Sequence, residues 1–149
     1  LVYAMGRGSK TNLILHKSMR SILWLILIIT FYQMFLGTQV RESIDYLVKQ
    51  GYSRTEWMDK IGIEFLIHRS FSWLVLILLG WMFWKNEQTT KYGIIRWTFI
   101  ILALELISGV LLAYVDMPGL VRTSHLIFAS VLFGMLLFSV FQLKKNPTS

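Results

Sequence analysis

Four long apolar runs constrain the fold of this chain more than any other feature of its sequence. They contain 18, 24, 22 and 24 residues and are Ser21–Thr38, Ile61–Trp84, Ile94–Val115 and Leu120–Leu143. A helix needs about 20 apolar residues to cross the ~30 Å hydrocarbon layer of a membrane. Because that layer offers no water to exposed backbone groups, each run is expected to be helical. The sequence therefore predicts an all-α membrane protein with a four-transmembrane-helix bundle.

The overall composition supports a membrane location. Of the 149 residues, 55% are hydrophobic and 15% are charged, whereas soluble domains average about 45–50% apolar and about 25% charged residues. The chain has no cysteine, which excludes disulfides, thiolate metal sites and cysteine nucleophiles. The net charge of +7 is concentrated in particular loops, and this distribution favours an effect on membrane orientation over nucleic-acid binding.

The distribution of basic residues predicts the orientation, because Lys and Arg collect in cytoplasmic loops. Residues 1–20 contain four basic residues and no acidic one, and the tail, residues 144–149, begins with two lysines. Residues 39–60 instead contain four basic and four acidic residues. We therefore expect both termini inside (N-in/C-in), with 1–20 as a cytoplasmic basic segment or linker, 21–143 as the bundle, 39–60 as an outer loop and 144–149 as a cytoplasmic tail.

Each inward-running span carries one histidine near its outer end. His68 is seven residues after Ile61, and His125 is five residues after Leu120. At ~1.5 Å per residue these positions lie about 10 Å and about 7.5 Å below the outer edge. Two imidazoles at matching depth can face each other across the core of a bundle.

The chemistry of such a pair points to a haem iron. Neutral imidazole binds zinc, copper and iron, but a tetrahedral zinc site needs three or four protein ligands. The predicted spans contain no third histidine and no cysteine. Because bundle cores commonly hold cofactors, His68 and His125 are predicted to be the two axial ligands of one haem iron.

Small residues and arginines surround the two histidines in the sequence. Residues four positions after each histidine are small, and glycines on the other two spans allow a flat ring to approach the backbone. Arginines near the outer side are placed to neutralise anionic propionate groups. The predicted cofactor-binding set is His68, His125, Ser72, Ala129, Gly37, Gly109, Arg69 and Arg122, with Arg41 and Arg54 as further outer-side arginines.

Simpler interpretations exist for each of these residues. A single histidine near a membrane interface is often merely tolerated, and arginines can extend to lipid headgroups without any ligand. Gly37 and Gly109 are equally explained as helix-packing positions. Glu105 near mid-span costs about 2.5–3.5 kcal/mol on insertion scales, so it is expected to be protonated or hydrogen-bonded inside the bundle, for example to Gln33. Glu64, one turn before His68, is a candidate to orient a ligand or accept a proton.

Four segments in this order resemble the C-terminal half of the haem A synthase family. They are YQMFLGTQVRE at Tyr32–Glu42, EFLIHRSFSW at Glu64–Trp73, LELISGVLLAYVDMP at Leu104–Pro118 and TSHLIFAS at Thr123–Ser130. The resemblance covers nearly the whole chain from Lys10 onward. It implies one half of a pseudo-duplicated eight-helix architecture, and a weak internal echo agrees with it: Gln33 precedes Gly37, and Glu105 precedes Gly109, by four residues.

The resemblance also implies a function. Haem A synthase oxidises a methyl group of haem O to the formyl group of haem A, which terminal oxidases of respiration require. The family's C-terminal bundle holds a haem b, whose two ligands would fall on His68 and His125, and the missing N-terminal half is expected to bind the substrate haem O. Expected partners are membrane lipid, the N-terminal half or a second copy of the bundle, and haem O synthase or a terminal oxidase; the implied location is the bacterial inner membrane.

The chain departs from the family pattern in three ways. Only one bundle is present, the cysteine pair of many members is absent, and Glu105 stands where the family often has glutamine. No catalytic residue is therefore assigned. The chain is either a piece of a full enzyme or a half-length version that pairs with another bundle, and two further interpretations stay open: a stand-alone membrane b-type cytochrome, and a cofactor-free assembly subunit.

Overall fold

The computed structural model describes residues 17–89, 91–115 and 119–142, and the regular secondary structure within these ranges is helical. These helices are α2 (Lys17–Lys49), α3 (Arg54–Lys60), α4 (Ile63–Gln88), α5 (Gly93–Tyr114) and α6 (Gly119–Gln142). All but α3 are long and apolar enough to cross a membrane. The predicted all-α membrane fold is confirmed; the predicted cytoplasmic tail and most of the basic N-terminal segment lie outside the described residues.

The region predicted as an outer loop, 39–60, contains helix. Helix α2 continues to Lys49, so its 33 residues extend about 50 Å, well beyond the ~30 Å hydrocarbon layer. At the start of helix α3, the Ser53 backbone N–H and hydroxyl both donate to the Glu56 carboxylate, at 2.7 and 2.6 Å, and the first of these bonds is one half of a capping box. These bonds hold the pKa of Glu56 below its usual value. Residues 39–60 are therefore formed mainly by the last turns of α2 and by the short helix α3.

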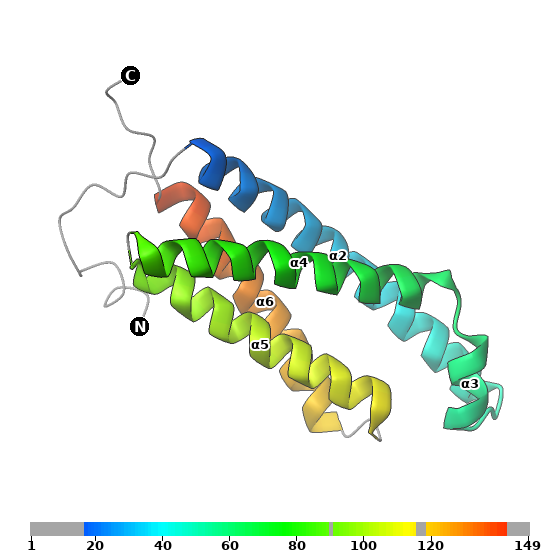
Figure 1. The fold of residues 1–149 in the computed structure, drawn as a ribbon. Coiled ribbons are helices and arrows are strands. Elements are labelled where there is room, and N and C mark those ends of the chain that lie inside the picture. Colours follow the sequence, from blue (N-terminus) through cyan, green and yellow to red (C-terminus); the bar gives the residue numbers. More distant parts are fainter. Residues whose placement is uncertain (1–16, 90, 116–118, 143–149) are drawn as a thin grey trace.

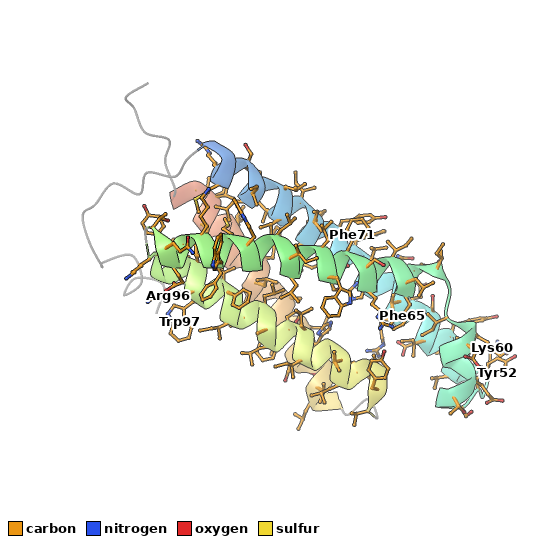
Figure 2. All side chains as sticks on the ribbon, viewed as in Figure 1. Tyr52, Lys60, Phe65, Phe71, Arg96 and Trp97 are labelled. Atoms are coloured by element: carbon orange, nitrogen blue, oxygen red, sulfur yellow. The ribbon has the colours of Figure 1, made fainter. Side chains whose placement is uncertain are left out.

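The four long helices form two pairs, α2 with α4 and α5 with α6 (Figure 1). The pairs lie together at the end where α2 begins and α6 ends, and they diverge toward the opposite end, beside α3 (Figure 1). Figure 2 shows Arg96 and Trp97 near the first end and Tyr52 and Lys60 near the second. The arrangement gives the bundle one closed end and one divergent end.

The apolar core fills the closed half of the bundle. Its fully buried side chains include Leu23 and Ile26 of α2, Leu79 and Met82 of α4, and Leu136 of α6. Toward the divergent end the buried side chains are mixed: Leu36 and Ile44 of α2 are apolar, whereas Gln33 of α2 is polar. The continuous apolar core therefore lies toward the closed end.

The turn between α4 and α5 is organised by Asn86, which is fully buried. Its side-chain oxygen accepts the Tyr92 backbone N–H at 2.8 Å, its amide donates to the Tyr92 carbonyl at 3.3 Å, and its own carbonyl accepts the Lys91 N–H at 2.8 Å. Lys91 adopts a left-handed φ of 51°. Arg96 also forms a two-pronged ion pair with Glu87 across this turn.

We expect Asn86→Ala to destabilise the bundle by about 1–3 kcal/mol, because the Tyr92 N–H and carbonyl would lose their partner in a buried site. The measurement is thermal unfolding in detergent, followed by circular dichroism. Gln88→Ala, at an exposed position two residues later, is the control and should leave the midpoint unchanged. Equal midpoints for both variants would show that the turn does not depend on Asn86.

Candidate functional site

The two histidines of the predicted site lie at equivalent places in the two helix pairs. His68 is five residues after the first residue of α4, and His125 is six residues after the first residue of α6. Both side chains are half-buried. Figure 2 labels Phe65 and Phe71 of α4, which lie three residues before and three residues after His68.

Each imidazole packs against a glycine of the partner helix in its own pair. A Cβ atom added to Gly37 of α2 would lie 3.5 Å from Cε1 of His68, and one added to Gly109 of α5 would lie 3.2 Å from Cε1 of His125. The second contact is tighter than nearly all real Cβ contacts, whereas the first is an ordinary one. The two glycines therefore make room for the histidine rings themselves, and the geometry repeats in both pairs.

His125 is held by hydrogen bonds from its ring nitrogen to α5. Its Nδ1 lies 2.9 Å from the Ser108 hydroxyl oxygen, 3.2 Å from the Glu105 carbonyl oxygen and 3.2 Å from Oε1 of the Glu105 carboxyl group. Sequence analysis did not single out Ser108; its position one residue before Gly109 and one turn after Glu105 was the available signal. The α5–α6 pair thus fixes both the position and the orientation of this ring.

His68 is held differently, through its backbone. The Gln33 side-chain amide donates to the His68 carbonyl oxygen at 2.9 Å and to the Ser72 hydroxyl at 2.7 Å, and Ser72 itself donates to the same carbonyl at 2.9 Å. Nδ1 of His68 is buried and has no hydrogen-bond partner among the described residues. The expected bond between Gln33 and Glu105 is wrong, because Gln33 bonds to α4 and Glu105 lies against His125.

The predicted arginines differ in their surroundings. Arg69 is exposed, and Arg41 is paired with Asp45 at 2.7 Å on α2. Nε of Arg122 is buried and unpaired among the described residues; because Arg122 precedes His125 by three residues, the two share one face of α6. The side chain of Arg54 lies outside the described part of the structure.

The remaining predicted residues are also located. Ser72 takes part in the bonds described above, and Ala129 is half-buried one turn after His125. The carboxyl group of Glu64 folds back over Gly62, where an added Cβ would overlap its Oε2. It therefore lies at the positive N-terminus of α4, a favourable place for a carboxylate, and this position explains the residue without a ligand.

The donor set fits a metal-centred macrocycle better than an isolated ion. No group of three or more His, Cys, Asp or Glu side chains able to hold a metal occurs within the described ranges, so a tetrahedral zinc site lacks ligands. Two imidazoles, each seated against a glycine, are a donor set that would suit a haem iron, and a metal-bound histidine typically donates its other ring N–H to an oxygen acceptor. His125 has such oxygen acceptors around Nδ1.

Comparisons with known proteins found matches that cover most or all of the chain. The family model described as cytochrome oxidase assembly protein matches residues 1–137. A protein named heme A synthase from Staphylococcus epidermidis strain RP62A is 22% identical over 166 residues, covering all of this chain and 53% of the relative. A heme A synthase from Staphylococcus aureus strain MSSA476 is 24% identical over 154 residues, covering 93% of this chain and 48% of the relative.

These matches also define how much of the relatives is represented here. The chain spans about half the length of the curated relatives that it matches, and it corresponds to the C-terminal half of the family. No solved structure matches the chain significantly. Relatives of this kind place the chain in a multi-pass membrane protein family.

Proposed function

Because the chain belongs to the cytochrome oxidase assembly protein (COX15-CtaA) family, we propose that it forms the haem b-binding half of a haem A synthase. The single observation that carries this proposal is the repeated seating of His68 on Gly37 and of His125 on Gly109, at 3.5 and 3.2 Å. Lipid packing alone gives no reason for two half-buried histidines to take matching places in two helix pairs.

In this proposal, His68 and His125 are the two axial ligands of one haem. A bound haem b supplies one-electron transfer through its iron. The protein contributes one imidazole nitrogen lone pair from α4 and one from α6. Gln33 and Ser72 tie α4 to α2 at the height of His68, whereas Ser108 and Glu105 tie the His125 ring to α5.

Arg122 is the proposed partner of an anionic haem propionate. Its buried Nε has no partner among the described residues, and a buried unpaired donor is costly unless a ligand satisfies it. A guanidinium–carboxylate pair is among the strongest charge-assisted bonds. Arg69 is exposed and is proposed to neutralise negative charge of the propionate groups at the outer side of the bundle. Ala129 and Ser72 are proposed to leave space for the flat ring beside the histidines.

Oxidation of haem O is proposed to belong to the partner bundle. The chain spans about half the length of its curated relatives, and none of the described residues is assigned a catalytic role. The partner is either the N-terminal half of the same enzyme or a second copy of this bundle. The proposed role of this half is to hold haem b beside the substrate bundle and to exchange electrons with it.

The experiment is expression of the chain with haem supplied, followed by purification and extraction. We expect one haem b per chain and a low-spin spectrum typical of two nitrogen ligands. To test the synthase role, the C-terminal half of the Staphylococcus aureus relative is replaced by this chain in cells lacking haem A synthase. Haem A should form, and should not form when the same chimera carries His68→Ala. A purified chain without haem would reject the proposal and favour a cofactor-free assembly subunit.

A further inference from the structure

We infer that the two histidines are inequivalent ligands, with Ser108 and Glu105 as positioning residues that fix the imidazole of His125, whereas no described side chain bonds to the imidazole of His68. This inference rests on the proposed function, and it concerns which ring the protein controls. It follows from the contrast between the two Nδ1 atoms. Nδ1 of His125 has three oxygen atoms within 3.2 Å, whereas Nδ1 of His68 has no hydrogen-bond partner among the described residues.

The hydrogen bonds around His125 determine where its proton lies. The Ser108 hydroxyl has one hydrogen, which it donates to the Glu105 carbonyl oxygen at 2.8 Å. The Ser108 oxygen, 2.9 Å from Nδ1, must therefore accept, and the Glu105 carbonyl can only accept. Because the Ser108 oxygen and the Glu105 carbonyl both accept, Nδ1 of His125 carries the hydrogen, and Oε1 of Glu105, 3.2 Å away, is a third acceptor when the carboxyl group is ionised. In a neutral imidazole the lone pair then lies on Nε2, the nitrogen that this geometry leaves for the iron.

The equivalent groups in the other pair are used on the backbone. Gln33 occupies the position that corresponds to Glu105, but its amide donates to the His68 carbonyl and to Ser72. Ser72 donates to that same carbonyl, so neither side chain reaches the ring nitrogen. No side chain among the described residues bonds to the His68 ring and selects its tautomer; the polar interaction of the ring within this pair is with the backbone of Gln33.

This contrast has a measurable consequence when the rings are removed. In His125→Gly, the vacated space is lined by the Ser108 oxygen and the Glu105 carbonyl, which can accept an N–H from an added imidazole. In His68→Gly, the vacated space contains no side chain that previously bonded to the ring. Free imidazole carries an N–H opposite its metal-binding nitrogen, whereas 1-methylimidazole carries a methyl group there.

The experiment titrates each glycine variant, in detergent with haem b, with imidazole and with 1-methylimidazole, and follows the low-spin absorption. His125→Gly should prefer imidazole about tenfold, the effect expected from one hydrogen bond. His68→Gly should bind the two ligands with similar affinity. Adding Ser108→Ala to His125→Gly should reduce the preference, with the Glu105 carbonyl as the remaining acceptor, whereas Ser130→Ala, an exposed serine that bonds to Leu126 of its own helix, should leave it intact.

Equal preferences in the two glycine variants would overturn the inference. If His125→Gly does not retain haem with either ligand, Ser108→Ala is compared with Ser130→Ala in the chain with both histidines. Haem dissociation should be about tenfold faster for Ser108→Ala, and equal rates would overturn the inference. The spectrum of the unmodified chain tests the proposed function separately from this inference. If the unmodified chain does not form a two-histidine spectrum, the proposed function is rejected. If it does, but the two glycine variants show equal ligand preferences, only the inequivalence of the two histidines is rejected.

Discussion

Replacing either His68 or His125 by alanine is expected to abolish stable haem binding, with at least a hundredfold loss of affinity. Each substitution removes one of two proposed iron ligands, and a single remaining imidazole would leave the iron without its second bond. Haem content after purification, measured by extraction and by the low-spin absorption, reports the effect. The helix content should stay near that of the unmodified chain, because the apolar core lies in the other half of the bundle.

The chain provides a matched control for this prediction. It has three histidines, and the third, His16, precedes the first described helix. His16→Ala should therefore retain a full haem complement. If His68→Ala retained the same haem content as His16→Ala, His68 would not be a ligand.

A bulky residue at Gly109 is expected to displace His125 and to remove haem almost as completely as loss of the histidine itself. A Cβ at this position already lies 3.2 Å from Cε1 of His125, so the larger side chain of Gly109→Leu occupies the space that the imidazole needs. Gly109→Ala should be milder, and Gly37→Ala milder still, because its Cβ would lie 3.5 Å from His68. Haem content per purified chain measures how much haem each of the three variants loses.

Gly134→Leu on α6 is the control for side-chain size. An added Cβ at Gly134 meets no atom within 4 Å, so this variant should bind haem normally. Equal haem loss in Gly134→Leu and Gly109→Leu would mean that helix distortion, and not the contact with His125, causes the effect. Full haem retention in Gly109→Leu would contradict the placement of the ring against α5.

The sequence predicted the fold well because the physics of a membrane span is simple. A run such as Ile94–Val115 has one low-energy form in hydrocarbon, and the observed α5, Gly93–Tyr114, differs from it by one residue at each end. The similar positions of His68 and His125 along their helices could also be predicted, since they lie five and six residues after the first residues of α4 and α6. The continuation of α2 to Lys49 could not be predicted, because the polar residues in this part of α2 are compatible with either a helix or a loop.

The details of the site could not be predicted in the same way. Gln33 and Glu105 occupy equivalent positions in the sequence, yet one bonds to a backbone carbonyl and the other lies beside a ring nitrogen. That difference depends on side-chain rotamers and on Ser108, which looks like an ordinary helix-packing serine in the sequence. Likewise, only the packed structure distinguishes the buried Nε of Arg122 from the exposed side chain of Arg69.

The central claim is that His68 and His125 ligate the same iron. The most direct measurement is low-temperature electron paramagnetic resonance of the oxidised, haem-loaded chain, combined with near-infrared magnetic circular dichroism to identify both axial ligands. We predict one low-spin iron per chain with two imidazole ligands, and loss of that signal in each histidine variant. A high-spin iron, or a low-spin signal that survives in His68→Ala or in His125→Ala, would contradict the account.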